Sequence, residues 1–230
     1  MIAARLTAIR ERIARAAERA GRDPATIRLV AISKTFGADS VRAAADAGQV
    51  DFGENKVQEA LEKIEQTSDL HLTWHLVGHL QTNKARKAAA SFNLIHSVDS
   101  EPLLAKIDQA ATEAGRRVDV LVQVDLAGET TKHGAREPEL QPIFDAARAC
   151  RSARIVGLML LPPAVDDPES ARPFFRQLRA VRDRLVAGGV DPSMLRELSM
   201  GMSHDFEVAV EEGATLVRVG TAIFGERSYV

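Results

Sequence analysis

Lys34 is the side chain with the clearest chemical potential, because it follows an apolar run over residues 28–33 and precedes a predicted turn at residues 35–37. A lysine at the end of a buried strand loses hydration, which favours its neutral amine. A neutral amine is a nucleophile that forms imines with aldehydes and ketones. The alternative is a lysine whose ammonium group extends from the strand end into solvent.

Two later segments have the composition of an anion-binding site. Ser199–Ser203 contains two serines and Gly201 and leads into a predicted helix, so hydroxyls, backbone N–H groups and a helix N-terminus can face one anion. Gly220 and Thr221 follow the last predicted strand and add a close backbone approach and another hydroxyl. Helix capping and glycine turns would explain either segment alone. Together the two segments predict a phosphate site.

The elements that position these residues follow from hydrophobic patterning, since short apolar runs alternate with helical patterns and no linker rich in Pro, Gly or Ser divides them. Eight strands are predicted: Arg28–Ser33, Val50–Gly53, Thr73–Gly78, Leu94–Val98, Val118–Val124, Ile155–Leu161, Glu197–Met200 and Leu216–Val219. The predicted helices are Ile2–Ala20, Asp39–Ala47, Glu54–Gln66, Asn83–Ala90, Pro102–Ala114, Glu137–Cys150, Glu169–Ala187 and His204–Glu212.

Eight strands separated by helices indicate a parallel sheet closed into a (β/α)8 barrel of the TIM type, with an extra N-terminal helix. An open doubly wound sheet is the alternative. We expect one domain over residues 1–230. In a barrel the C-terminal strand ends share one face, and the loops after strands seven and eight often bind phosphate there. Lys34 and both phosphate-binding segments are therefore expected to meet in one pocket.

Arg218 bears on the kind of ligand. A lysine facing a phosphate site suggests either pyridoxal 5′-phosphate or a phosphorylated sugar with an aldehyde or ketone group. Arg218 lies in the last strand beside Gly220, where its guanidinium can face the ring nitrogen of a heterocycle and keep that nitrogen unprotonated. Such a cofactor is a weaker electron sink. An ion pair of Arg218 with Glu54 or Asp99 is the alternative.

Composition narrows the function classes. The chain has 30 basic and 32 acidic residues, which gives no electrostatic reason to expect nucleic acid or an anionic membrane as a partner. The longest apolar run, Ile155–Leu161, is far shorter than the roughly 20 residues of a spanning helix, and charged residues interrupt the first 20, so no secretory signal is predicted. The single cysteine, Cys150, excludes an internal disulfide and a cysteine metal cluster. We predict no metal site and a cytoplasmic location.

Several segments also resemble a known family. They are Ser33–Thr35, Phe52–Glu59, Trp74–Lys84, Gly157–Met159, Leu198–Ser203 and Val217–Gly225. Over nearly its whole length the chain is similar to the pyridoxal phosphate homeostasis proteins, and the third and last segments are the specific signals. The resemblance implies the N-terminal barrel of alanine racemase without that enzyme's second domain. It also implies pyridoxal 5′-phosphate bound as an internal aldimine by a protein without established enzymatic activity.

Residue roles follow from this resemblance. It makes Lys34 the Schiff-base lysine and Arg218 the partner of the pyridine nitrogen. The other implied cofactor-binding residues are Ser199, Gly201, Ser203, Gly220 and Thr221 at the phosphate, and Asn55 and Met159 near the ring. For His75 and His79, packing is the more frequent role of a strand histidine. For Lys132, in the polar loop 128–134, a solvated loop side chain is weighed against a contact with cofactor or a recipient protein. No catalytic residue is predicted.

The implied function is storage, buffering or delivery of the cofactor by a monomer, with transient contacts to apoenzymes that use pyridoxal phosphate. Racemisation needs an acid/base group on each face of the ring, and Lys34 supplies only one. In alanine racemase a tyrosine of the partner's second domain serves the other face, whereas the one tyrosine here is Tyr229, expected to close the last helix. Two alternatives stay open: a small pyridoxal-phosphate-dependent amino-acid racemase, and a cofactor-free Schiff-base aldolase.

Overall fold

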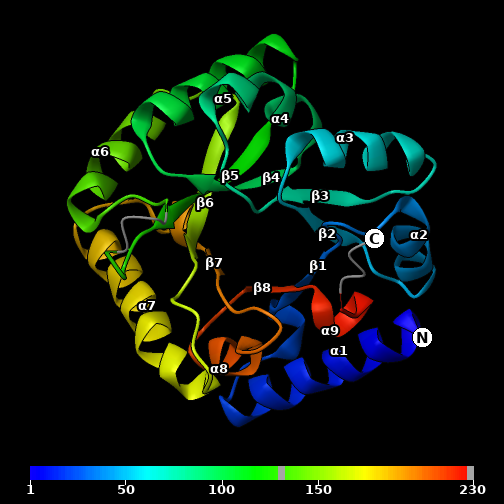
Figure 1. Cartoon of the computed structure of the whole chain (residues 1–230). Coiled ribbons are helices and arrows are strands. Elements are labelled where there is room, and N and C mark those ends of the chain that lie inside the picture. Colours follow the sequence, from blue (N-terminus) through cyan, green and yellow to red (C-terminus); the bar gives the residue numbers. More distant parts are fainter. Residues whose placement is uncertain (129–132, 227–230) are drawn as a thin grey trace.

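The computed structural model describes residues 1–128 and 133–226 and has a closed barrel of eight parallel strands at its centre (Figure 1). The strands pair in sequence order, and the last pairs with the first. Their bounds are β1 Arg28–Ile32, β2 Asp51–Glu54, β3 Thr73–Leu76, β4 Leu94–Val98, β5 Val118–Val124, β6 Ala153–Leu160, β7 Glu197–Ser199 and β8 Leu216–Val219. The predicted (β/α)8 barrel is confirmed, and the alternative of an open sheet is wrong.

Helices surround the barrel on its outer side (Figure 1). They are α1 Ile2–Arg19, α2 Ala38–Asp46, α3 Val57–Gln66, α4 Ala85–Ser91, α5 Glu101–Glu113, α6 Glu137–Ala147, α7 Arg172–Ala187, α8 Phe206–Glu211 and α9 Thr221–Phe224. Short 3₁₀ turns cover residues 24–26, 82–84, 168–171 and 192–195. The predicted N-terminal helix, α1, packs against α2, α8 and α9 through apolar residues at helical spacing, among them Leu6, Ile9 and Ile13. It fills the part of the outer ring that the four-residue α9 leaves uncovered.

Among the predicted helix starts that differ from the structure, two are explained by side-chain hydrogen bonds. Glu54, expected to begin a helix, is the last residue of β2, because its buried carboxylate binds Ser33 and Lys63 and keeps the chain extended. His204, expected to begin the predicted helix His204–Glu212, lies in a turn, since Asp205 Oδ1 accepts the N–H of Met202 at 2.6 Å and α8 starts only at Phe206. Both differences are made by side-chain hydrogen bonds that hydrophobic periodicity does not report.

The barrel interior contains a compact apolar cluster of eight buried residues: Val30, Ile32, Val77, Leu94, Leu121, Val156, Met159 and Leu216. A larger cluster fills the space between the strands and the outer helices. The inner cluster closes the barrel below its C-terminal end, where Ile32 and Val77 also line a cavity. The barrel is therefore a packed core with one end available for a ligand.

Gly157 holds β6 and β7 at their observed separation. A β-carbon at this buried position would overlap the carbonyl oxygen of Glu197 in β7. We expect Gly157→Ala to lower the free energy of unfolding by about 3 kcal/mol, since neither backbone can move without disturbing the closed sheet. The measurement is urea unfolding followed by circular dichroism. Gly37→Ala, at a position with open space around the added carbon, is the control. Equal midpoints for the two variants would contradict the expectation.

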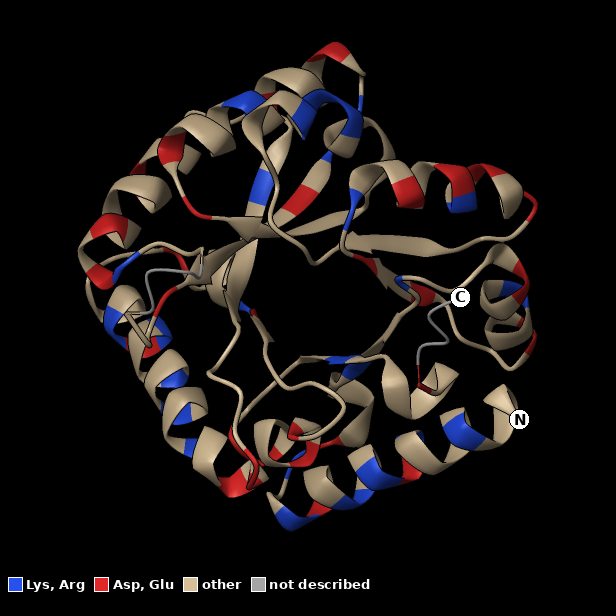
Figure 2. Ribbon diagram, viewed as in Figure 1, with Lys and Arg blue, Asp and Glu red and all other residues tan. Residues whose placement is uncertain are grey.

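Basic and acidic residues are both distributed over the outer helices (Figure 2). No helix among the described residues has both the length and the apolar composition needed to cross a membrane.

Candidate functional site

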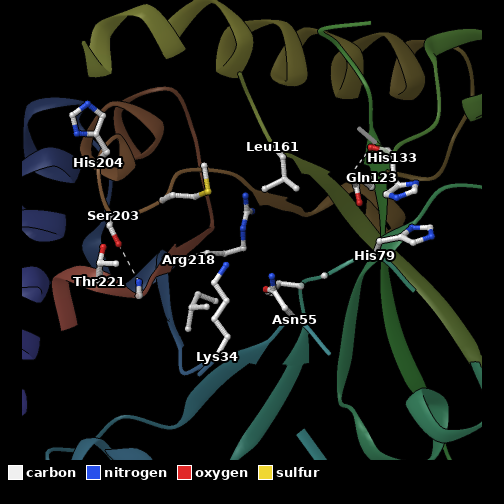
Figure 3. A pocket seen from close by; sticks show the side chains of 15 residues that line it. Lys34, Asn55, His79, Gln123, His133, Leu161, Ser203, His204, Arg218 and Thr221 are labelled. Atoms are coloured by element: carbon white, nitrogen blue, oxygen red, sulfur yellow. Dashed lines mark hydrogen bonds between the residues drawn. The ribbon is translucent and has the colours of Figure 1, made fainter. Parts of the chain in front are cut away.

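A cavity of about 510 Å³ opens at the C-terminal ends of the barrel strands (Figure 3). This volume is in the range of about 300–1,000 Å³ that small-molecule sites occupy. Most of the predicted site residues line it: Lys34, Asn55, Ser203, Arg218, Gly220 and Thr221. The side chain of Lys34 points between Asn55 on one side and Ser203 and Thr221 on the other (Figure 3). Residues at or just after the ends of β1, β2, β7 and β8 thus meet in one place.

Lys34 is held by a tight turn at the end of β1. Ser33 donates its N–H to Gly53 and accepts the N–H of Phe36, both at 3.0 Å. Between them Thr35 has a φ of 71°, a left-handed conformation that is rare and strained for a β-branched residue. Strain of this kind persists only where the surroundings enforce it, so the position of Lys34 is specified by the fold.

A buried ion pair also stabilises the turn at the end of β1. Lys63 Nζ donates to Glu54 Oε1 at 2.6 Å and to the carbonyl oxygen of Ser33 at 2.8 Å. Ser33 Oγ donates to Glu54 Oε1 at 2.6 Å. Burial raises the pKa of Glu54, and the bonds from Lys63 and Ser33 oppose this rise. The residue that precedes Lys34 is thereby bonded through its N–H, its hydroxyl and its carbonyl group.

The side of the cavity formed by Ser203 and Thr221 carries a cluster of hydrogen-bond donors. The backbone N–H groups of Ser203, His204, Thr221 and Ala222 have no acceptor within the described part of the chain. Ser203 Oγ accepts the N–H of Gly220 at 3.1 Å, which joins the two predicted phosphate-binding segments. Unsatisfied N–H groups that converge with hydroxyls form an anion-binding concavity. This part of the cavity fits a phosphate group.

Arg218 is 3% exposed and lines the floor of the cavity. Its Nη1 donates to Ser199 Oγ at 2.6 Å, and its Nη2 donates to the carbonyl oxygen of Leu160 at 2.8 Å. Burial lowers the pKa of Arg218 to about 10, against a smaller opposing effect of Asp205. No carboxylate within the described residues forms an ion pair with it, so the alternative of a pair with Glu54 or Asp99 is not found. A buried cation of this kind favours a ligand that accepts a hydrogen bond.

Hydrogen bonds continue from Arg218 across the barrel interior. His96 Nδ1 lies 2.9 Å from Ser199 Oγ, His96 Nε2 lies 3.0 Å from His75 Nδ1, and His75 Nε2 lies 2.9 Å from Asp51 Oδ1. Burial lowers the pKa of both imidazoles, and that of His96 falls well below its usual value. Because Arg218 donates to Ser199, the hydroxyl proton is available to His96, and each neutral imidazole then donates from Nε2 towards Asp51. This chain fixes the orientation of the guanidinium.

The chain matches known proteins over nearly its whole length. The alanine racemase N-terminal domain family matches residues 4–228. A pyridoxal phosphate homeostasis protein of Aquifex aeolicus is 44% identical over 230 residues, which cover 98% of each chain. The protein of that name in Escherichia coli K12 is 38% identical over 99% of this chain and 97% of its own. This chain belongs to the pyridoxal phosphate homeostasis protein family.

Solved structures show the family's fold. PipY of Synechococcus elongatus with pyridoxal phosphate bound is 39% identical and superposes with a TM-score of 0.87, over 98% of this chain and all of PipY. Alanine racemase of Clostridium difficile is 17% identical with a TM-score of 0.71, over 94% of this chain and 55% of its own, and shares the fold. The predicted alanine-racemase-like barrel is confirmed.

Three residues that the family resemblance assigned to the cofactor do not line the cavity. Met159 is fully buried in the inner cluster below the cavity floor. The hydroxyl of Ser199 is occupied by Arg218 and His96. Gly201 has a φ of 91°, and a β-carbon there would lie 2.5 Å from Ala209 Cβ, so it shapes the turn before α8. Each of these three residues therefore affects the site only through neighbouring residues.

Other residues enter the site from positions that sequence reasoning did not assign to it. Gln123, His133 and Leu161 line the cavity together with His79 (Figure 3). His75 is buried and bonded within the barrel. The sequence feature that indicates the buried chain of hydrogen bonds is the presence of polar residues inside apolar strands, such as His96 in β4. Lys132 and Tyr229 lie outside the described residues.

The neutral histidines predict a dependence of stability on pH. Because the folded-state pKa of His75 and His96 lies below the unfolded value, stability is complete above pH 6.5 and is lost as the pH falls. Each histidine is expected to contribute a loss of about 1.4 kcal/mol per pH unit. Urea unfolding between pH 7.5 and 5 measures this slope. His96→Gln should make this slope shallower, and an unchanged slope in that variant would reject the explanation.

Proposed function

We propose that this protein binds pyridoxal 5′-phosphate reversibly in the cavity and so buffers its free concentration, without turning over a substrate. The observation that carries the proposal is the placement of Lys34 opposite four backbone N–H donors that lack an acceptor among the described residues. PipY, a relative with the same fold, has been solved with pyridoxal phosphate bound. Free pyridoxal phosphate is a reactive aldehyde, so a protein that holds and releases it protects other amines.

Each side of the cavity suits one end of this cofactor. Ser203, Thr221 and the neighbouring N–H groups would hold the phosphate, and Gly220 lets the backbone approach it. Lys34 Nζ would attach to the aldehyde carbon as a Schiff base with loss of water. Arg218 would donate to the ring nitrogen, and Asn55, which lies beside Lys34 (Figure 3), would border the ring. Ser199, Gly201 and Met159 would act indirectly, by orienting Arg218, shaping the turn and supporting the floor.

The absence of turnover is part of the proposal. When bound, the cofactor supplies an electron sink, which is strongest when its ring nitrogen is protonated. Even with its pKa lowered to about 10, Arg218 stays protonated at neutral pH and therefore donates a hydrogen bond rather than a proton. A nitrogen that accepts from Arg218 remains unprotonated, and the sink is weak. The residues thus favour holding the cofactor, and reversal of the attachment would release it to apoenzymes.

Reduction with borohydride followed by peptide mass mapping tests the proposal. We expect the protein as purified to carry one pyridoxyl group on the peptide that contains Lys34. An adduct on another peptide, or none, would overturn the assignment. Exchange of an amino acid's α-proton for deuterium at a catalytic rate would instead indicate a racemase. Trapping that occurs only with an added ketose or aldehyde substrate would indicate an aldolase.

We also propose that the protein acts in the cytoplasm as a monomer. Within the described residues, the exposed large hydrophobic side chains are Met1, Val50, Val186 and Met202, and they belong to separate segments. Scattered apolar side chains are normal on a monomer's surface, whereas an obligate dimer needs a contiguous patch. Sedimentation equilibrium should give a mass near 25.0 kDa at all concentrations. A mass that doubles as the concentration rises would contradict the monomer.

A further inference from the structure

We propose that His79, Asp99 and His133 form a binding site for a divalent transition-metal ion at the mouth of the cavity. One ligand atom of each residue lies within 4.8 Å of the other two. His79 Nδ1 is 3.9 Å from Asp99 Oδ2, and the imidazole rings of His79 and His133 stack with centroids 3.5 Å apart. In Figure 3 both imidazoles lie together at one side of the cavity. The inference does not depend on the cofactor proposed above.

Three successive strand ends bring these ligands together. His79 follows the end of β3, Asp99 comes directly after β4, and His133 follows β5. A sequence separation of 54 positions between His79 and His133 gives no local metal-binding pattern, which is why the sequence indicates no site. Parallel strands place their C-terminal ends on one face, so the barrel itself makes the cluster.

The backbone around both histidines is restrained. Gly78, which precedes His79, packs so closely on Asn55 that a β-carbon would overlap the Asn55 backbone. The carbonyl oxygen of His133 accepts from Gln123 Nε2 at 2.6 Å. Two residues later, Ala135 donates to the carbonyl oxygen of Gln123 at 2.8 Å. The ligand-bearing segments are thus fixed to β2 and β5, and only side-chain rotation is needed to complete a site.

The ligand set indicates the class of metal. Two imidazole nitrogens and one carboxylate oxygen suit borderline ions such as Zn²⁺, Ni²⁺ or Cu²⁺, whereas Mg²⁺ and Ca²⁺ prefer oxygen ligands only. The nearly parallel rings, with an interplanar angle of 10°, must turn until their nitrogen lone pairs converge on the ion. Both imidazoles are exposed and have room to do so. Three protein ligands leave at least one coordination position open.

That open position would face the cavity, because His79 and His133 line it together with Lys34. A bound divalent cation there would attract an anionic group, such as the carboxylate of an amino acid, to the entrance of the site. The chemical class of ligand is therefore a divalent transition metal, with a carboxylate as its exchangeable partner.

Isothermal titration of the full-length protein with ZnCl₂ tests the site. We expect one Zn²⁺ per chain, and at least tenfold weaker binding in His133→Ser and in Asp99→Asn. Loss of a residue that only hydrogen-bonds to a metal ligand already lowers metal affinity about 10- to 100-fold. His204→Gln is the matched control, because His204 also lines the cavity but lies outside the cluster. X-ray absorption at the zinc edge should show two imidazole ligands.

Both substituted side chains of the test are at least partly exposed, so circular dichroism should show that the variants remain folded. No zinc binding by the parent protein would overturn the proposal. Unchanged affinity in either His133→Ser or Asp99→Asn would overturn it as well, because zinc would then bind elsewhere, including on a bound cofactor.

Discussion

Lys34→Ala is expected to yield a folded protein that purifies without the yellow colour of attached pyridoxal phosphate and carries no borohydride-reducible adduct. Loss of the covalent bond should weaken binding by about 100-fold, or about 2.7 kcal/mol. Binding should not vanish, since the N–H groups around Ser203 and Thr221 still face a phosphate. Fluorescence titration measures the residual affinity, and absorption spectroscopy measures the attached cofactor.

The control for this experiment is Lys56→Ala. Lys56 follows Asn55 near the same end of the barrel, but its side chain is 75% exposed and pairs with Glu59. This variant should keep the colour and the affinity of the parent. A Lys34→Ala protein that retains a stoichiometric reducible adduct would show that another amine carries the cofactor. Equal loss of colour in both variants would point to altered solubility or loading in place of a specific attachment.

The barrel could be predicted from the sequence because each strand is a short apolar run between helical patterns. The predicted strands all occur, with ends that differ by a few residues. Lys34, Ser203, Gly220 and Thr221 could be assigned to one pocket because strand ends in this fold share a face. For these residues the local sequence pattern and the barrel topology lead to the same prediction.

The rest of the site depends on contacts between distant segments. Glu54 ends β2 as an extended residue because Lys63, nine positions later, binds its buried carboxylate. Ser199 has the position of a phosphate ligand in the sequence, yet its hydroxyl lies between Arg218 and His96. Neither propensity nor periodicity reports which of two polar atoms a hydroxyl will meet in a packed interior. Such roles follow from the closed barrel and not from local spacing.

Arg218→Met is expected to make the cofactor-free protein more stable while weakening its affinity for pyridoxal phosphate. Burial that lowers the pKa of Arg218 from 12.5 to about 10 means that the charged form is disfavoured in the folded state by roughly 3 kcal/mol. Because the folded-state pKa lies below the unfolded value, protonated Arg218 destabilises the folded state, and stability falls as the pH falls through these values. At pH 7 Arg218 is protonated in both states, so the full penalty applies. Methionine removes the charge and fills a similar volume.

Part of this gain is offset by groups that Arg218 now satisfies. The carbonyl oxygen of Leu160 loses its donor, which costs about 1–2 kcal/mol, while Ser199 keeps His96 as a partner. A net stabilisation of about 1–2 kcal/mol remains, and urea unfolding of protein freed of cofactor measures it. Arg154→Met, which removes an exposed guanidinium paired with Asp119, should change stability by less than about 1 kcal/mol.

The two measurements on Arg218→Met together separate a binding role from a structural one. A residue retained for the fold should lower stability when replaced, and lower affinity only as a consequence. Replacing a residue retained for the ligand should raise the stability of the cofactor-free protein and still reduce affinity, because a buried charge that forms no ion pair among the described residues is stabilised mainly by what it binds. A lower urea midpoint for Arg218→Met would therefore assign the buried guanidinium to the barrel core.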